Sequence, residues 1–340
     1  MKAKKRKAIF TLLLVLVIIM LVSTLFGAAT IAPGEVSRSI ASRFIGFFTE
    51  DAVVNTIIWD IRIPRILLAA VVGLLLSTSG VILQGVLRNP LADPYILGVS
   101  AGASIGAMLS FVLGIDFVFF GFSTTPLLAF VFALMAVFLV YRLSHVAGRT
   151  SPETLILAGV AVSAFAASVL SIIIIVTGDL RAIYFWLLGD LSSASWLDVM
   201  TVTPYAIIGI IVAYFYSKDL NALLLGDDMA LTLGVDVEVV RLFLLGVASL
   251  MAAAAVSVCG LIGFVGLIVP HFVRLIVGPN HRFLIPFAAL SGMLILVFAD
   301  IVARSAFSFV STELPIGVVM AIIGAPFFIY LLRRRRISGK

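Results

Sequence analysis

The sequence has few charged residues, one cysteine and three scattered histidines, and each scarcity excludes a class of protein. Charged residues make up 12% of the 340 residues and hydrophobic residues 62%, whereas about a quarter of an ordinary soluble domain is charged. A soluble enzyme is therefore excluded, because it would need more polar residues to cover its surface. The single Cys259 excludes a disulfide framework and a cysteine-rich zinc site. The histidines form no closely spaced pair, so we expect no metal site.

The sequence also lacks a phosphate-binding loop of the pattern GxxxxGK[ST], and its apolar segments contain almost no acidic or basic residues. We therefore expect that the chain is not an ATPase by itself and not an enzyme. Ion-coupled carriers and charged channel filters keep ionisable residues inside the membrane, so their scarcity argues against both classes. Energy for uphill transport would have to come from a partner.

Long hydrophobic segments make up most of the chain. A helix that crosses a membrane needs about 20 mostly apolar residues. Ten segments meet or approach this length: 9–30, 62–83, 95–113, 124–143, 153–176, 197–217, 239–258, 261–277, 283–303 and 314–332. The stretch 239–278 is divided in two because Gly260, Gly263, Gly266 and Pro270 offer places to turn. We predict an all-α integral membrane protein in which residues 1–340 form a single transmembrane domain of ten helices.

The positions of lysine and arginine predict the orientation. If the N-terminus is cytoplasmic, most of the 23 lysines and arginines lie in inside segments. An even number of spans also places Arg333-Arg334-Arg335-Arg336 inside. We therefore expect a multi-pass protein of the cell membrane with both termini cytoplasmic. The basic termini are interpreted as neighbours of anionic lipid rather than as nucleic-acid contacts. Residues 9–30 are interpreted as a retained span, because they exceed the apolar core of a signal peptide.

The inside segment 218–238 is longer than a connection between two helices requires. Asp219 or Asn221 could cap one short helix, and Asp227 could cap a second helix that ends at Gly234. Extra ordered structure at this place favours a docking surface for a cytoplasmic partner. A linker that lies on the membrane surface is the alternative.

Prolines and glycines mark two further features. Residues 89–94 read NPLADP and predict a tight turn, because two prolines forbid a continuous helix. Gly98, Gly102 and Gly106 follow at intervals of four and would form a stripe on one helix face. Such stripes let helix backbones approach closely in lipid, so we expect helix packing there. Lining of a wide path for a large solute is the alternative.

Several charged residues lie at the outer ends of predicted helices. Arg62, Arg65 and Arg304 run against the excess of basic residues inside. One interpretation is interfacial placement together with an Asp300–Arg304 pair one helical turn apart. The other is recognition of an acidic partner or anionic solute. Glu313, which opens the last segment, is interpreted as a helix cap.

A weak internal repeat is also visible. Residues 80–90 and 260–270 share a spacing of ten between glycine and proline and follow the second and seventh segments. These segments would run in opposite directions across the membrane. Two halves of inverted topology are a common plan in transporters.

Motifs extend in order over nearly the whole chain. They are Arg62-Ile-Pro-Arg65, Gln84, Asn89-Pro-Leu-Ala-Asp-Pro94, Leu97-Gly-Val-Ser-Ala-Gly102, Leu157-Ala-Gly-Val160, Leu225-Gly-Asp-Asp228, Leu233-Gly234, the run GFVGLIVPHFVR from Gly263 to Arg274, the run ADIVAR from Ala299 to Arg304, the run ELPIGV from Glu313 to Val318, and Gly324-Ala-Pro326. Together they resemble the membrane-spanning permease subunits of ABC importers for iron–siderophore complexes, haem and vitamin B12.

The resemblance implies a homodimer of ten-helix subunits, each with two five-helix halves of inverted topology, and a solute path along the two-fold axis. Two copies of a separate cytoplasmic ATPase, which would hold ATP and magnesium, would bind on the inside. A solute-binding protein would dock from outside. The chain itself would bind no cofactor, metal or nucleic acid.

The resemblance also implies roles for single residues. The outer arginines Arg62, Arg65 and Arg304 would meet glutamates of the binding protein. Residues 219–234 would be coupling helices that sit in a cleft of the ATPase. The coupling positions would be Leu225, Gly226, Asp227, Asp228, Ala230, Leu233 and Gly234, and the inner gate would be Asn89, Leu91 and Ser151. At the last of these, the chain departs from the family pattern, because Pro152-Glu153 replaces small hydroxyl residues.

The substrate is less determined than the class of protein. By frequency within the family, an iron–siderophore complex or haem is the first expectation. Vitamin B12 and molybdate are alternatives within the same family. An ion-coupled secondary transporter is the alternative from another class.

Overall fold

The computed structural model describes residues 2–45, 51–114, 118–119, 122–146, 149–177, 181–306 and 312–338. The long helices are α1 (Lys2–Ser23), α2 (Pro33–Ile45), α4 (Ile63–Val86), α5 (Val99–Leu113), α6 (Thr124–Ser144), α7 (Pro152–Thr177), α9 (Trp196–Phe215), α12 (Val237–Cys259), α13 (Val265–Val277), α14 (His281–Ser305) and α16 (Ile316–Ser338). The short helices are α3 (Ala52–Asn55), the π-helix η1 (Thr56–Arg62), the 3-10 helix η2 (Pro94–Leu97), α8 (Arg181–Leu187), α10 (Ser217–Leu223) and α11 (Asp227–Thr232).

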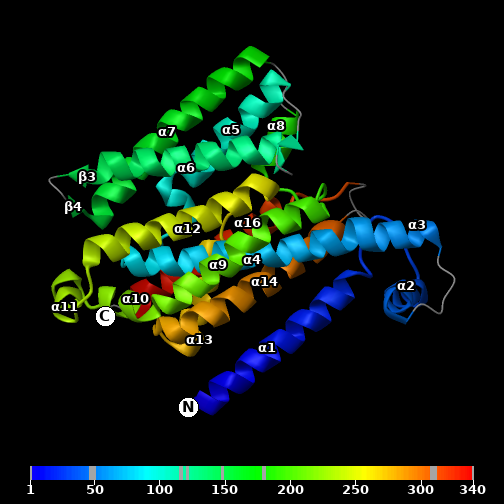
Figure 1. Cartoon of the computed structure of the whole chain (residues 1–340), viewed down its shortest axis with the longest axis horizontal. Coiled ribbons are helices and arrows are strands. Elements are labelled where there is room, and N and C mark those ends of the chain that lie inside the picture. The colour runs from blue at the N-terminus through cyan, green and yellow to red at the C-terminus, as the bar shows by residue number, and fades with distance from the viewer. Residues whose placement is uncertain are drawn as a thin grey trace.

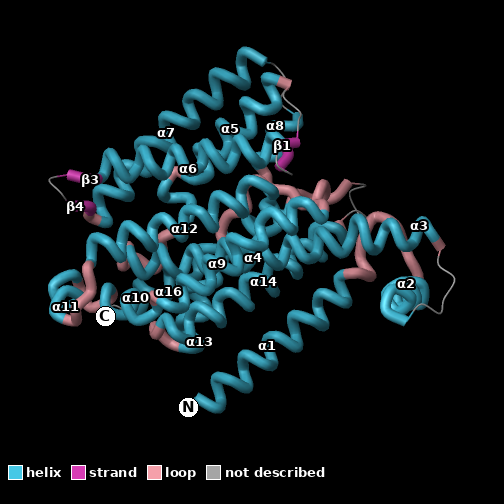
Figure 2. Tube along the Cα trace, viewed as in Figure 1, coloured by secondary structure: helices cyan, strands magenta, loops and turns pink. Residues whose placement is uncertain are grey.

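Strand structure in the described residues is confined to two antiparallel pairs of two-residue strands. These are β1 (Val118–Phe119) with β2 (Phe122–Ser123), and β3 (His145–Val146) with β4 (Arg149–Thr150). Figure 2 shows helices joined by loops and turns in the rest of the chain that it colours. The prediction of an all-α protein is confirmed.

Apolar helices of the described residues overlap the predicted segments. Six are long and apolar enough to cross a membrane, and the helical stretches Lys7–Ser23, Val99–Leu113, Val265–Val277 and Ile316–Tyr330 are shorter. The second segment begins earlier than predicted, because α3, η1 and α4 join into one helix of 35 residues from Ala52 to Val86. The predicted division of 239–278 is confirmed, since Gly260 and Phe264 have positive φ angles of 67° and 70° and separate α12 from α13.

Helix α4 is the buried centre of one group of helices. It packs against α9, α12, α13 and α14, and Figure 1 shows it in the middle of this group. Glycine permits two of these contacts. A Cβ atom at Gly73 would lie 2.2 Å from the carbonyl oxygen of Gly292 in α14, and one at Gly80 would lie 2.0 Å from that of Gly266 in α13. Backbones that approach so closely gain dispersion energy, which is a main attraction between helices that are surrounded by lipid rather than by water.

The contact between Gly80 and Gly266 gives another explanation for the glycine-to-proline spacing that suggested a repeat. Gly80 lies inside α4, whereas Gly260 follows the last residue of α12, so residues 80–90 and 260–270 do not occupy equivalent positions. The two stretches instead touch each other where α4 crosses α13. A spacing of glycine and proline alone does not distinguish a repeat from a helix crossing.

Helices α5, α6 and α7 form a second group beside α12 (Figure 1). A Cβ atom at Gly102 would lie 2.2 Å from the carbonyl oxygen of Phe132, and one at Gly106 would lie 2.2 Å from that of Leu128, both in α6. Gly98 has a different place, because its φ of 78° forms the turn between η2 and α5. Two of the three predicted stripe residues therefore lie in the contact between α5 and α6.

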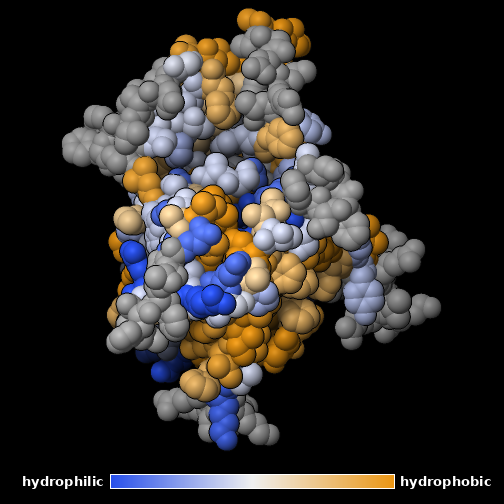
Figure 3. Space-filling view, turned by 90° about the vertical axis from the view of Figure 1, so that its right-hand side faces the viewer, coloured by the Kyte–Doolittle hydropathy of each residue, from blue (hydrophilic) through white to orange (hydrophobic). Residues whose placement is uncertain are grey.

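The molecule has two distinct ends. Helices α10 and α11 lie at one end of the helix bundle, and α2 and α3 lie at the opposite end (Figure 1). We call these the α11 end and the α2 end. Figure 3 views the molecule from the α2 end, where hydrophilic residues gather near the centre of the face between hydrophobic regions.

Candidate functional site

The segment 218–238 folds into the two short helices α10 and α11, at the α11 end. Gly226, with φ of 106°, precedes α11, and Gly234, with φ of 82°, follows it. The predicted caps are wrong. Asp219 and Asn221 lie inside α10, which begins after Tyr216 without a side-chain cap.

Asn221 and Asp227 instead make contacts with other helices. The side-chain oxygen of Asn221 accepts a hydrogen bond of 2.9 Å from the backbone N–H of His281 at the start of α14. Asp227 is the first residue of α11, and its carboxylate binds arginines. Local capping preference failed here because tertiary partners were available to both side chains.

Apolar side chains cover the outward face of the helix pair. The exposed fractions lie between 55 and 61% for Leu225, Met229, Leu231 and Leu233. Ala230 is fully buried on the opposite face, where α11 packs against the rest of the protein. Exposed leucines and methionine on an ordered cluster of helices are typical of a contact surface. Two of the seven predicted coupling residues, Gly226 and Gly234, form the turns on either side of α11. Two others, Asp227 and Asp228, place carboxylates in its first turn.

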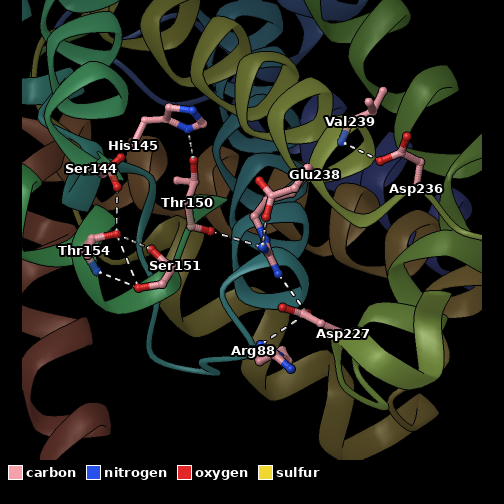
Figure 4. Close-up of polar contacts among 11 residues, drawn as sticks. Arg88, Ser144, His145, Thr150, Ser151, Thr154, Asp227, Asp236, Glu238 and Val239 are labelled. Carbon is pink, nitrogen blue, oxygen red and sulfur yellow. Dashed lines mark hydrogen bonds and ion pairs between the residues drawn. The ribbon is translucent and has the colours of Figure 1, made fainter. Parts of the chain in front are cut away.

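One carboxylate joins this helix pair to the neighbouring segments, as Figure 4 shows. Oδ1 of Asp227 lies 2.8 Å from Nη2 of Arg241 in α12 and 3.3 Å from Nη2 of Arg88, which follows α4. Nη1 of Arg241 donates to the backbone oxygen of Thr150 at 3.1 Å and to Glu238 at 3.2 Å. The Arg241 side chain is only 3% exposed. Sequence reasoning missed Arg88 and Arg241, and the only available signal was that Arg88 immediately precedes the NPLADP turn.

The predicted gate residues lie in two turns beside these arginines. In the first turn, Oδ1 of Asn89 accepts a hydrogen bond of 3.0 Å from the backbone N–H of Leu91. In the second, Oγ of Ser151 accepts a hydrogen bond of 3.2 Å from the backbone N–H of Thr154 in the first turn of α7. Thr150 is buried, and its hydroxyl lies 3.0 Å from Nδ1 of His145. The ion pairs of Arg88 and Arg241 with Asp227, and the hydrogen bond from Arg241 to Thr150, therefore connect α11 to the two turns that were predicted to form the gate.

The first gate turn continues into a buried polar contact. Asp93 accepts a hydrogen bond of 2.9 Å from the backbone N–H of Tyr95, and the Tyr95 hydroxyl lies 3.0 Å from the backbone oxygen of Ile262. Burial raises the pKa of Asp93 to about 6, although the hydrogen bond from Tyr95 acts in the opposite direction. The turn is thus fixed to the loop that separates α12 from α13.

The three outer arginines lie at the α2 end and are buried. Nε of Arg65 lies 2.8 Å from Oδ1 of Asp300, and its Nη1 lies 2.5 Å from Glu313. Nη2 of Arg304 lies 2.9 Å from Oδ2 of Asp300, so the predicted pair one helical turn apart is confirmed. Arg62 donates to the backbone oxygen of Thr24 at 2.6 Å. The arginines are at most 5% exposed. Glu313, predicted as a cap, binds Arg65.

Comparison with known proteins identifies the family of the chain. Residues 13–334 match the FecCD transport family. The chain belongs to this family.

Three relatives of this chain are permeases of import or transport systems. The chain is 47% identical over 286 residues to the cobalamin import system permease protein BtuC of Halobacterium salinarum. The matched residues cover 84% of this chain and 75% of that protein. It is 36% identical to the hemin transport system permease protein HmuU of Yersinia pestis, over 96% of both chains. It is 40% identical to the Fe(3+) dicitrate transport system permease protein FecD of Escherichia coli, over 82% of this chain and 86% of that one.

A solved structure agrees with these relatives. It is an inward-facing conformation of a metal-chelate type ABC transporter, and it superimposes with a TM-score of 0.83 at 31% identity over 97% of this chain and 99% of that one. The resemblance inferred from the motifs is confirmed. The FecCD protein is the multi-pass membrane permease of an ABC importer, and ATP hydrolysis belongs to a separate subunit.

Proposed function

We propose that this permease forms the membrane path for a metal chelate and that a cytoplasmic ABC ATPase drives it through α10 and α11. The observation that carries the proposal is the exposed apolar surface of this helix pair, formed by Leu225, Met229, Leu231 and Leu233. Because two short helices are not needed to join α9 to α12, an ordered and apolar segment at this place fits a cleft in a partner.

Binding of the cognate ATPase to the purified permease in detergent tests this role. Leu231→Glu and Leu233→Glu place charges in the proposed contact, and we expect affinity to fall at least tenfold, about 1.4 kcal/mol. Leu197→Glu is the matched control, since Leu197 is an exposed leucine at the start of α9, at the opposite end of the molecule. Unchanged affinity in both coupling variants would remove the docking surface from α11.

We propose ten membrane spans in two halves of five, with both termini in the cytoplasm. The first half would comprise α1, α4, α5, α6 and α7, and the second α9, α12, α13, α14 and α16. Both α5 and α13 are short and follow a break after the preceding long helix, which fits a repeat of inverted topology. Epitope tags at the two chain ends should be accessible from the same, cytoplasmic side, and tags on opposite sides would contradict the count.

We propose that a second copy of the chain packs near α7. This helix is the least buried of the six long ones. Its exposed face includes small residues at helical spacing, Ala161, Ala164, Ser168 and Ser171. Small residues favour close approach of another helix over contact with lipid tails. A cysteine introduced at Ala164 should crosslink two copies of the chain in membranes. Absence of this crosslink would count against the interface.

We propose that the binding protein docks at the α2 end and that the outer arginines take part. In the single chain these arginines already hold Asp300, Glu313 and backbone oxygens. A carboxylate of the binding protein would therefore have to replace a present partner, and Glu313 is the most accessible one because its side chain is 23% exposed. Docking would thus proceed by exchange of carboxylates around Arg65.

For the substrate, we propose an iron–siderophore complex or haem first. Several relatives carry iron citrate, hydroxamate or hemin in their names. Cobalamin is the second candidate, favoured by the 47% identity to a cobalamin permease. Uptake of each chelate by vesicles that contain the permease, its ATPase and its binding protein would decide. Molybdate has no support among these relatives, and an ion-coupled carrier does not fit the family.

A further inference from the structure

One side chain of α11 contacts both segments that lead to the gate turns. A single oxygen of Asp227 pairs with Arg241 at 2.8 Å and with Arg88 at 3.3 Å (Figure 4). The Asp227 side chain is 39% exposed and that of Arg88 34%, whereas Arg241 is nearly enclosed. Charge-assisted hydrogen bonds gain strength where water is excluded, so the pair with Arg241 is the firmer of the two.

Arg88 leads from Asp227 to the first gate turn. It is the residue before Asn89, and its φ of 49° is in the left-handed region, which costs free energy for a residue with a side chain. The ion pair with Asp227 helps to hold this backbone in place. Since Asn89 also fixes the backbone N–H of Leu91, a displacement of Arg88 is passed directly to the turn.

Arg241 leads from Asp227 to the second gate turn. Its Nη2 holds Asp227 while its Nη1 donates to the backbone oxygen of Thr150, the residue before Ser151. The guanidinium group is planar and rigid, so these two acceptors are kept at a fixed separation. Movement of Asp227 therefore moves the start of α7, or breaks a buried hydrogen bond.

The backbone on either side of α11 transmits a movement of this helix poorly. Gly226 and Gly234 flank the helix, both with positive φ, and among the described residues nothing lies within 4 Å of a Cβ atom placed at Gly234. Glycine at both ends allows α11 to rotate at low cost. The ion pairs of Asp227 with Arg88 and Arg241 connect α11 to the two turns.

We propose that Arg88, Asp227 and Arg241 form a positioning link that makes α11 and the two gate turns move as one body. The link rests on the proposed role of α10 and α11 as the surface that the ATPase moves. The force applied to α11 reaches residues 89–91 through Arg88 and residues 150–151 through Arg241. None of the three residues needs to touch the substrate or the nucleotide.

Transport per ATP hydrolysed, measured in vesicles with the cognate ATPase and binding protein, tests the link. Asp227→Asn should lower this ratio about fivefold or more, the lower end of ordinary coupling between sites, while ATPase binding persists. Asp227→Glu keeps a carboxylate and should restore much of the ratio. Asp236→Asn is the matched control, because Asp236 is an exposed aspartate that caps α12 and asparagine caps equally well. A wild-type ratio in Asp227→Asn would overturn the link.

A distance measurement separates the link from a merely stabilising ion pair. Spin labels at Thr232 in α11 and at the exposed Leu157 near the start of α7 report whether the two segments move together. Cys259 is buried, so the introduced cysteines are the ones expected to react. In the full complex the distance should stay constant between nucleotide-free and nucleotide-bound states, and it should change in Asp227→Asn. A distance that differs between the two nucleotide states while Asp227 is still present would contradict the proposal.

The two proposals fail in different ways. If Leu231→Glu and Leu233→Glu leave ATPase affinity unchanged, the docking surface is wrong whatever Asp227 does. If those variants lose the ATPase but Asp227→Asn keeps its wild-type transport ratio, the docking surface stands and the positioning link is wrong.

Discussion

Arg65 and Asp300 are 235 positions apart in the sequence and form a buried ion pair of 2.8 Å that joins α4 to α14 at the α2 end. Asp300 is fully enclosed and also pairs with Arg304 at 2.9 Å. One carboxylate thus compensates two buried guanidinium groups. This arrangement explains how buried arginines persist at the α2 end of a permease with so few charges.

Asp300→Asn should destabilise the permease strongly. The substitution removes the carboxylate charge that both buried arginines face, and breaking a buried pair from one side costs about 3 kcal/mol or more. Thermal unfolding of the detergent-solubilised protein measures the loss. Glu313→Gln is the control, since Glu313 is partly exposed and Arg65 keeps Asp300. Equal stability of the two variants would show that Asp300 does not have this role.

Glu313→Gln should also tighten docking of the binding protein. If carboxylates of the partner compete with Glu313 for Arg65, removal of the competing charge raises affinity by up to about fivefold, the free energy of a partly exposed pair. The gain should shrink at high salt. Affinity that is unchanged or weaker in this variant would argue against an exchange at Arg65.

Asp93→Asn should remove a pH dependence of stability. The pKa of Asp93 is raised from 3.8 to about 6, so its stabilising contribution is complete below pH 4 and is lost as pH rises through about 6. Asparagine keeps the acceptor for Tyr95 and carries no charge. Above pH 6 the variant should be more stable than wild type by up to about 3 kcal/mol, and near pH 4 the two should agree. Parallel unfolding profiles from pH 4 to 8 would contradict this.

Gly106→Ala and Gly246→Ala should have opposite effects. A Cβ atom at Gly106 would lie 2.2 Å from the backbone oxygen of Leu128, whereas in the described part of the chain nothing lies within 4 Å of one at Gly246. Overpacking between α5 and α6 should cost about 1 to 3 kcal/mol, and alanine in α12 should be neutral or slightly stabilising. Unfolding temperatures of the two variants test this, and a harmless Gly106→Ala would refute the packing role.

Local signals in the sequence were sufficient for much of the fold. Apolar length predicted the positions of the long helices, and glycine correctly placed the break between α12 and α13. Helical spacing predicted the pair of Asp300 and Arg304, because residues four apart share a helix face. Motifs in order identified the family.

Contacts between distant segments were beyond such signals. Arg65 gave no sign that Asp300 is its partner, since the pair depends on how α4 meets α14. Arg241 attracted no notice, because a single arginine at the start of a helix is ordinary until Asp227 and Thr150 are brought beside it. The caps predicted for α10 were wrong for the same reason: Asn221 finds the start of α14 instead.

Uptake of a metal chelate into vesicles that contain the permease, its binding protein and its ATPase tests the central claim most directly. We predict uptake that requires both the ATPase and ATP, persists when the proton gradient is collapsed, and is lost when Leu231 and Leu233 are replaced by glutamate. The permease alone should hydrolyse no ATP. Uptake that continues without the ATPase and stops when the proton gradient is collapsed would contradict the account.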